Sequence, residues 1–327
     1  MNDFVFYTQP DELFIKAATY QYPERLPVKI GVLPETFIKY KDGLKEVLAK
    51  HEDLLGGWWR DYDPYEHMPR RFRKGQWTDE WGCVWSNGYE GHDSLVSGHP
   101  VKTRADVHAM KAPGGDFGLP HGFMYLRLLD LRGFEEAMID FAEEPPELQT
   151  LIDKVLNYNL RQVKLALEKS TDKMVVFADD LGMQSGLAIG AGKWRKYMKP
   201  CYAAMYKPCK DDGRLIFMHT DGCIHEIIPD LRECGVDMIN PQFRANGLDN
   251  LERVCKRNRI PVCLDFDRQL FPFGTPSDMR AHVRECVERL YLPEGGLALN
   301  LEIGGEEPLE NIDALLGAVN EYRFYKG

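Results

Sequence analysis

Two short apolar segments, each followed by polar residues, constrain the fold of this chain more than any other feature. Residues 174–178 (Met-Val-Val-Phe-Ala) precede the aspartates at 179–180. Residues 214–218 (Arg-Leu-Ile-Phe-Met) precede His219 and Asp221. Apolar runs of this length, separated by segments with helical periodicity, predict buried parallel strands. Because parallel α/β folds place their chemistry beyond the carboxyl ends of the strands, these polar residues predict the rim of an active site.

Strand and helix patterns alternate from residue 174 to the C-terminal end of the chain. The expected strands are 174–178, 214–218, 236–240, 261–264 and 297–301, and the helices expected after them are 191–210, 225–233, 249–256, 277–290 and 308–322. Five such units with short connections predict a parallel sheet, and their number favours closure into a single (β/α)8 TIM-type barrel. A doubly wound open sheet is the alternative.

The part of the chain before residue 174 has a less regular pattern. The elements expected there are strands at 26–32 and 123–129 and helices at 10–18, 39–52, 134–143 and 146–169. One barrel of about 250 residues plus an extension accounts for the chain length. We therefore expect an N-terminal extension with the first barrel elements (1–75) and the remainder of the barrel (76–327).

The composition excludes several classes of function. Hydrophobic residues make up 44% of the chain, and no apolar run approaches the roughly 20 residues of a membrane span. The formal net charge of −10, from 41 basic and 51 acidic residues, disfavours nucleic-acid binding. Residues 1–4 do not begin a secretory signal, and the eight cysteines contain no CxxC pair, so a cytoplasmic location is expected.

Polar residues follow each of the five expected strands, and in a barrel they would meet at one mouth. They are Asp179, Asp180, Gln184, His219, Asp221, Asn240, Gln242, Asp265, Asp267, Asn300 and Glu302. His219 and Asp221, two residues apart, point to one face and suit Zn²⁺, with Glu302 as a third ligand. The alternatives are a hydrogen-bonded core histidine with Glu302 at the surface, and a thiolate site formed by Cys223 and Cys263.

Three further patterns have both a structural and a functional interpretation. Asp180 is expected to enter the mouth, because successive strand residues point in opposite directions; helix capping is the alternative. Five of the six tryptophans fall within residues 58–85, either as packing or as the wall of a pocket for a flat ligand. The basic residues at 70–74 are either a solvated loop or a clamp for a carboxylate. No GxGxxG or GxxxxGK[ST] loop supports nucleotide binding.

Short motifs spread over the chain carry a family resemblance. They are Asp-Asp-Leu-Gly-Met-Gln-Ser-Gly-Leu (179–187), His-Thr-Asp-Gly (219–222), Ile-Pro-Asp-Leu (228–231), Gly-Val-Asp (235–237), Asn-Pro-Gln (240–242), Phe-Gly-Thr-Pro (273–276), Pro-Leu-Glu-Asn (308–311), Leu-Arg-Gly-Phe (131–134) and Asp-Glu-Trp-Gly (79–82). With these motifs the chain resembles the uroporphyrinogen decarboxylase superfamily over roughly residues 75 to 325. The resemblance implies a single (β/α)8 barrel, of a kind that often dimerises.

Two functional branches share the fold that this resemblance implies. True uroporphyrinogen decarboxylases hold the carboxylates of their substrate with an N-terminal motif of the Arg-Gln-Ala-Gly-Arg type, which this sequence lacks. The other branch contains zinc-dependent methyltransferases that work with corrinoid proteins. Its thiol-activating members carry cysteines where this chain has Asp221 and, approximately, Glu302. Oxygen ligands at both positions argue against coenzyme M as substrate and suit a hard Lewis acid that polarises an ether oxygen.

The resemblance therefore implies a zinc-dependent methyltransferase closer to the aryl ether O-demethylase components than to haem-pathway decarboxylases. It would move a methyl group from a small donor, such as a methoxylated aromatic, to a corrinoid carried on a separate protein. The implied site comprises Asp180 and His219 as catalytic residues, His219, Asp221 and Glu302 as zinc ligands, and Trp81, Gln184, Asn240, Gln242 and Asp265 around the substrate. The alternatives are decarboxylation of a porphyrinogen or another acid, and a non-catalytic ligand-binding barrel.

Overall fold

The computed structural model describes residues 12–327, which form two compact units. Unit 1 comprises residues 76–86 and 95–241, and unit 2 comprises residues 12–75, 87–94 and 242–327. The helix expected at 10–18 is confirmed from its third residue onward as α1 (Glu12–Ala18). Residues 1–4, on which the expectation about targeting depended, lie outside the described part.

Three parallel strands form the sheet of unit 1. They are β5 (Met174–Ala178), β6 (Leu215–Thr220) and β7 (Met238–Pro241), with β6 in the middle. His219 on β6 pairs with Ala178 on β5 and with Asn240 on β7. This register brings the carboxyl ends of the three strands level, so the residues that follow them start from one edge of the sheet.

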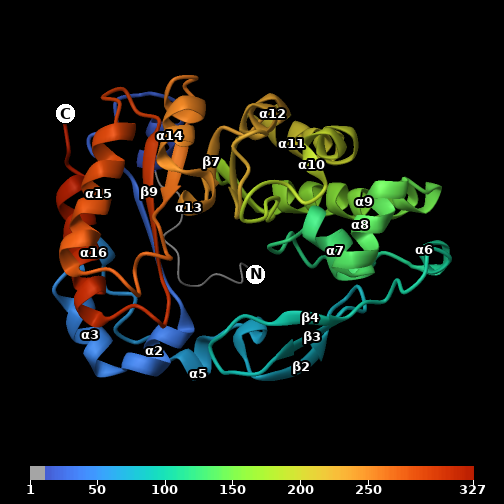
Figure 1. Cartoon of the computed structure of the whole chain (residues 1–327), viewed down its shortest axis with the longest axis horizontal. Helices are drawn as coiled ribbons and strands as arrows, with labels where there is room; N and C mark the ends of the chain where they lie inside the picture. Colours follow the sequence, from blue (N-terminus) through green and yellow to red (C-terminus); the bar gives the residue numbers. More distant parts are fainter. Residues whose placement is uncertain (1–11) are drawn as a thin grey trace. The chain divides into compact units, whose positions relative to one another are not determined.

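The helices of unit 1 include those expected at 134–143, 146–169, 191–210 and 225–233, and two, α6 and α7, that were not expected. They are α6 (Asp106–Ala109), α7 (Tyr125–Arg132), α8 (Phe134–Glu143), α9 (Pro146–Lys169), α10 (Gly190–Lys193), a π-helical turn (Trp194–Met198), α11 (Lys199–Asp211) and α12 (Ile228–Cys234). Helix α9 begins with Pro146 in its first turn and buries Leu148, Leu151, Ile152 and Val155, which share one face at helical spacing. Helix α9 packs against α11, α6 and α7, and against α11 most extensively (Figure 1).

The strand expected at 123–129 is wrong, because this segment contains most of helix α7. The first backbone N–H groups of the helix, from Met124, Tyr125 and Leu126, donate to the carboxylate of Asp179. Helix N-termini need such acceptors, and here the acceptor is more than 50 residues away in sequence. A mostly apolar run without a local cap does not distinguish a strand from a buried helix.

The structure also contains a second sheet, which was not expected. Its three strands are β2 (Gly75–Thr78), β3 (Val84–Asn87) and β4 (Leu95–Gly98), with β3 in the middle and antiparallel to β4. The indole rings of Trp77 and Trp85 stack on this sheet, with centroids 5.4 Å apart and planes 11° from parallel. The Nε1–H of Trp85 donates to Asp79 at 3.1 Å. Part of the tryptophan-rich segment is therefore a cross-strand packing feature.

The sheet of unit 2 also has three parallel strands. Strand β9 (Leu297–Ile303) pairs with β1 (Val28–Val32) on one side and β8 (Val262–Asp265) on the other. The helices of this unit are α1, α2 (Pro34–Tyr40), α3 (Asp42–Ala49), α4 (Glu52–Leu55), α5 (Pro64–His67), α13 (Phe243–Asn246), α14 (Leu248–Leu251), α15 (Pro276–Leu290) and α16 (Leu309–Tyr322), with a 3-10 turn (Arg70–Phe72) and a π-helical turn (Glu252–Lys256). Helices α15 and α16 pack on each other (Figure 1).

The α/β class and the five expected strand-helix units are confirmed. The described residues contain six strands in parallel pairing, three in each unit, and these pairings alone do not establish an eight-stranded barrel. Within residues 12–327, no helix has the length and apolar composition that crossing a membrane requires.

A buried histidine in unit 2 makes stability depend on pH. His282 on α15 is 8% exposed, and its Nε2 accepts the backbone N–H of Asp267 at 3.1 Å. Burial lowers the pKa of His282 below its usual 6.5, and the cation of Arg244 acts in the same direction. The negative charges of Asp267 and Glu285 oppose this shift without cancelling it.

We expect stability to fall as the pH decreases through 6.5 and below. Between the pKa of His282 in the folded chain and 6.5, the unfolded chain binds a proton that the folded chain does not. The stability contributed by neutral, buried His282 is therefore complete above pH 6.5 and is lost as the pH falls to the pKa of the folded chain. The slope is at most about 1.4 kcal/mol per pH unit. Urea unfolding of the wild type and of His282→Gln at pH 7.5, 6.5 and 5.5 measures it. Equal pH dependence in the two proteins would contradict the assignment.

Candidate metal centre

Two strand ends in unit 1 present the side chains of Asp180 and His219 to each other. The backbone N–H of Asp179 donates to the carbonyl of His219 at 3.1 Å, which continues the pairing of β5 and β6 by one residue. Asp180 comes next, and its Oδ1 accepts the backbone N–H of Asp221 at 2.9 Å. The imidazole Nε2 of His219 then lies 3.9 Å from the same Oδ1 atom.

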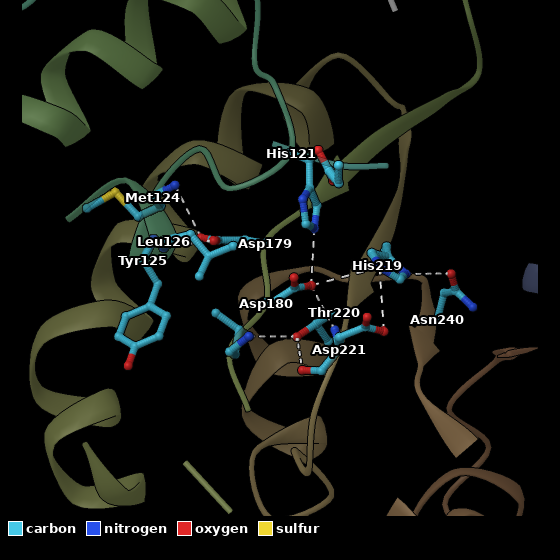
Figure 2. Close-up of polar contacts among 12 residues, drawn as sticks. His121, Met124, Tyr125, Leu126, Asp179, Asp180, His219, Thr220, Asp221 and Asn240 are labelled. Atoms are coloured by element: carbon cyan, nitrogen blue, oxygen red, sulfur yellow. Dashed lines mark hydrogen bonds and ion pairs between the residues drawn. The ribbon is translucent and has the colours of Figure 1, made fainter. Parts of the chain in front are cut away.

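His121 joins this pair from the loop that precedes α7. The backbone N–H of Gly122 donates to the carbonyl of Ala178 at 2.9 Å and holds the loop beside the end of β5. As a result, Nε2 of His121 lies 3.1 Å from Oδ1 of Asp180. Figure 2 shows the side chains of His121, Asp180 and His219 converging from three segments of the chain.

The ligand atoms of His121, Asp180 and His219 all lie within 4.8 Å of one another. Two imidazole nitrogens and one carboxylate oxygen form a donor set that catalytic zinc sites use, with a fourth position left for water or substrate. The residues present therefore fit zinc on the chemistry of their donor atoms.

The surroundings of His219 fix its proton on the nitrogen that faces away from this cluster. Its Nδ1 lies 2.8 Å from the amide oxygen of Asn240, which can only accept, so Nδ1 carries the hydrogen. The lone pair of Nε2 is then directed toward Asp180, and toward Asp221, whose Oδ1 is 3.8 Å away. A hydrogen bond of this kind orients a metal-binding histidine and selects its tautomer.

The charge state of Asp180 follows from competing effects. Burial by itself raises the pKa of its carboxyl group. The hydrogen bond with His121, the electrostatic interactions with His121 and His219 and the backbone N–H of Asp221 outweigh burial and hold the pKa well below its ordinary value. The carboxylate is therefore ionised at neutral pH, as metal binding requires.

Asp179 points the other way and braces the site. It is fully buried and accepts the N–H groups of Met124, Tyr125 and Leu126 at 2.6 to 3.2 Å. The hydroxyl of Tyr202 on α11 donates to the same carboxylate at 2.6 Å. Burial raises the pKa of Asp179, while these donors favour the ionised form. One side chain thus joins β5, α7 and α11 directly behind Asp180.

The loops after β5 and β6 are held together by two glycines in backbone contact. Gly222 has a φ of 83°, and a Cβ atom built on it would lie 2.1 Å from the carbonyl carbon and oxygen of Gly182. The N–H of Gly182 donates to Asp221 at 3.2 Å, and that of Cys223 donates to Met183 at 2.7 Å. Only glycine fits this approach, which sets the separation of the two loops.

The remaining predicted residues of unit 1 have different surroundings. Trp81 is 7% exposed, with its ring against Tyr158 at 4.8 Å and the Arg127 guanidinium at 5.8 Å. Gln184 lies exposed in the turn after β5. Their predicted contacts with substrate remain predictions.

Gln242, Asp265 and Glu302 belong to unit 2. Gln242 forms an isolated bridge with Asp265, whose Oδ1 accepts from the Asn300 amide at 2.8 Å. Glu302 on β9 pairs with the guanidinium of Arg268 at 2.6 Å. Burial raises the pKa of the Glu302 carboxyl to about 7, whereas the Arg268 charge favours its ionised form. The predicted role of Glu302 as a metal ligand remains a prediction.

The cysteines considered as alternative ligands are buried thiols. Cys223 lies in unit 1, with its Sγ 3.4 Å from Nδ1 of His225. Cys263 lies in unit 2, and burial raises the pKa of its thiol to about 12. A thiol with a raised pKa is a poor metal ligand, because the thiolate is the form that binds.

The basic segment at 70–74 is partly engaged within unit 2. Arg71 pairs with Asp93, and Arg73 donates to the backbone carbonyls of Met68 and Tyr65 at 3.1 Å. Arg71 and Arg73 are thus engaged within the chain and are not simply solvated, and a role of the segment as a clamp for a carboxylate remains a prediction.

His121 is the residue of the cluster that the sequence did not predict. It lies in a Pro-His-Gly turn at 120–122, before a segment assigned to a strand. Gly122, which hydrogen-bonds to the end of β5, was the only nearby residue that marked this segment as a turn.

Comparison with protein-family models identifies the family of this chain. The model described as uroporphyrinogen decarboxylase (URO-D) matches residues 128–322. The chain belongs to this family. The superfamily resemblance predicted from the sequence motifs is thereby confirmed.

Among solved structures, a methyltransferase from Methanosarcina mazei is similar over 94% of this chain and 97% of its own, with a TM-score of 0.63 and 17% identity. At this identity the similarity concerns the fold. A dihydropteroate synthase from Xanthomonas albilineans aligns over 52% of this chain and 61% of its own, with 13% identity and a TM-score of 0.34, too low to support an argument. No curated protein sequence matches the chain significantly.

Proposed function

We propose that this member of the URO-D family is a zinc-dependent methyltransferase on a (β/α)8 scaffold. It moves a methyl group from a small donor, in the first instance a methoxylated aromatic compound, to a corrinoid carried on a separate protein. The observation that carries the proposal is the cluster of His121, Asp180 and His219 at the carboxyl ends of parallel strands. The family and the fold shared with a methyltransferase support it.

The three side chains would hold zinc through Nε2 of His121, Nε2 of His219 and the Asp180 carboxylate. Bound zinc would supply a Lewis acid that stabilises negative charge developing on the ether oxygen of the donor as its bond to the methyl carbon breaks. Asn240 keeps the His219 lone pair directed inward, and the Asp179 brace fixes Asp180. Asp221 lies close enough to His219 to act as a further ligand or to bind a polar group of the donor.

Metal analysis of protein purified without chelators or a metal-binding tag tests this function, with His219→Ala as the variant. We expect about one zinc per chain in the wild type and little in the variant. Methyl transfer from methoxylated aromatics to a cobalt(I) corrinoid protein should be lost together with the metal, because both depend on the same imidazole.

Two outcomes would overturn the proposal. One is wild-type protein that contains no zinc and takes up none. The other is a His219→Ala variant that transfers methyl groups without zinc. Release of carbon dioxide from a porphyrinogen by metal-free protein would instead identify the decarboxylase function for which the family is named.

A further inference from the structure

A second group of acidic side chains lies in unit 2, where the loop 304–308 joins β9 to α16. Glu35, at the start of α2, reaches this loop, and its Oε1 accepts the N–H of Gly305 at 2.8 Å. Two more bonds fasten the loop to the same helix. Lys39 donates to the carbonyl of Gly305 at 2.6 Å, and Tyr40 donates to that of Glu307 at 2.8 Å.

Glu307 is a buried acid whose carboxylate is only partly satisfied. The residue is 5% exposed, and within residues 12–327 no hydrogen-bond donor reaches its Oε2 atom. Burial raises the pKa of Glu307, and the charges of Glu35 and Glu306 act in the same direction, whereas the N–H groups of Glu307 and Gly304 oppose them. A buried carboxylate without a positive partner is costly, so this position calls for a cation or a proton.

The missing side chain of Gly304 leaves a gap that these carboxylates line. The three atoms closest to the position of a Cβ on Gly304 are Oε2 and Oε1 of Glu307, at 3.2 and 3.3 Å, and Oε1 of Glu35, at 3.3 Å. Both oxygens of Glu307 therefore face the gap almost equally, and one oxygen of Glu35 faces it from α2. In this arrangement a cation could bind both oxygens of Glu307 and one oxygen of Glu35.

The cationic side chains near this gap have other partners. Lys39 is bound to a backbone carbonyl, and Nδ1 of His92 lies 3.2 Å from Oε2 of Glu35, the oxygen that does not face Gly304. Arg268 pairs with Glu302, a third acid whose charge state is influenced by Glu307. Two acidic side chains therefore meet at Gly304, and these contacts of Lys39, His92 and Arg268 are made to other atoms.

We propose that Glu35 and Glu307 bind a hard divalent cation of the calcium type beside Gly304. Calcium takes oxygen ligands at flexible geometry, accepts bidentate carboxylates and completes its shell with backbone carbonyls and water. The three atoms that face Gly304 are carboxylate oxygens, so the site differs in metal preference from the cluster of His121, Asp180 and His219. The cation would hold the β9–α16 loop against α2, a role independent of the proposed methyl transfer.

Thermal unfolding of the full chain, stripped of metal with a chelator, tests this site. Calcium or magnesium alone is added up to millimolar concentration. With two carboxylates, we expect a dissociation constant on the order of 0.1 to 1 mM and a calcium-dependent rise in Tm of several degrees. Glu307→Gln should lose this response, and Glu306→Gln, the same change at the exposed neighbouring acid, should keep it.

The variant His219→Ala separates this site from the zinc centre. It should keep the calcium response even though it loses zinc, so the two proposals can fail independently. Absence of any response to calcium or magnesium in the wild type would overturn the inference. An equal response in Glu307→Gln would also overturn it. If the stripped wild type becomes more stable relative to stripped Glu307→Gln as the pH falls, a shared proton holds the site in place of the cation.

Discussion

Replacing Asp180 by asparagine is expected to remove most of the affinity for zinc. It should also cost some stability at neutral pH, because the lowered pKa of Asp180 means that the fold favours the ionised carboxylate. The amide oxygen can still accept the N–H of Asp221, and the shape of the side chain is unchanged. What is lost is the negative charge between two imidazoles, on which the metal depends. Loss of a partner outside the ligand set typically costs about 10- to 100-fold in affinity. Loss of a ligand should cost at least about 100-fold.

Competition of each variant with a chromogenic zinc chelator measures the affinity, and urea unfolding of the metal-free proteins measures stability. Asp221→Asn is the matched comparison, because it removes a carboxylate 3.8 Å from the same His219 ring. A comparable loss in both variants would support the sequence-based assignment of Asp221 as a ligand. Wild-type affinity in Asp180→Asn would remove Asp180 from the metal centre.

Part of this site could be predicted because it depends on local sequence. The apolar runs at 174–178 and 214–218 identify two strands, and the chemistry of parallel sheets assigns importance to the polar residues that follow. His219 and Asp180 were found in this way. They are close in the structure because β5 and β6 are parallel neighbours and Ala178 lies opposite His219. The residues that end two such strands start from the same edge of the sheet.

The rest of the site depends on contacts between segments that are distant in sequence. His121 reaches Asp180 because Gly122 bonds to the end of β5, more than 50 residues later. The same is true of α7, whose N-terminal N–H groups find their acceptor in Asp179. Neither contact has a local signature, so the sequence suggested a strand where the chain forms a helix and gave no reason to include the histidine.

The largest loss of stability is expected from Asp179→Asn, one residue from the metal ligand. Asp179 accepts four hydrogen bonds in a fully buried position, three from α7 and one from Tyr202. An asparagine has one acceptor oxygen, and its NH₂ group would face donors. Three of the bonds reach Oδ2 and one, from Leu126, reaches Oδ1, so an asparagine with its oxygen in the Oδ2 position leaves the Leu126 N–H without an acceptor. A buried donor left without an acceptor costs about 1 to 3 kcal/mol, and we expect a destabilisation of that size.

Tyr202→Phe separates the brace into its parts, because it removes one donor and leaves the three N–H groups of α7 bound. It should cost about 1 kcal/mol. If the free energy of unfolding has the same dependence on urea concentration in all proteins, the urea midpoints give the loss of stability in each variant.

The hydrogen bonds of Asp179 also predict an indirect effect on function. His121 precedes α7 by four residues, so loosening α7 in Asp179→Asn should lower zinc affinity in folded protein although all three proposed ligands are retained, whereas Asp180→Asn removes a proposed ligand directly. Equal stability of Asp179→Asn and the wild type would show that α7 is held in place by packing alone.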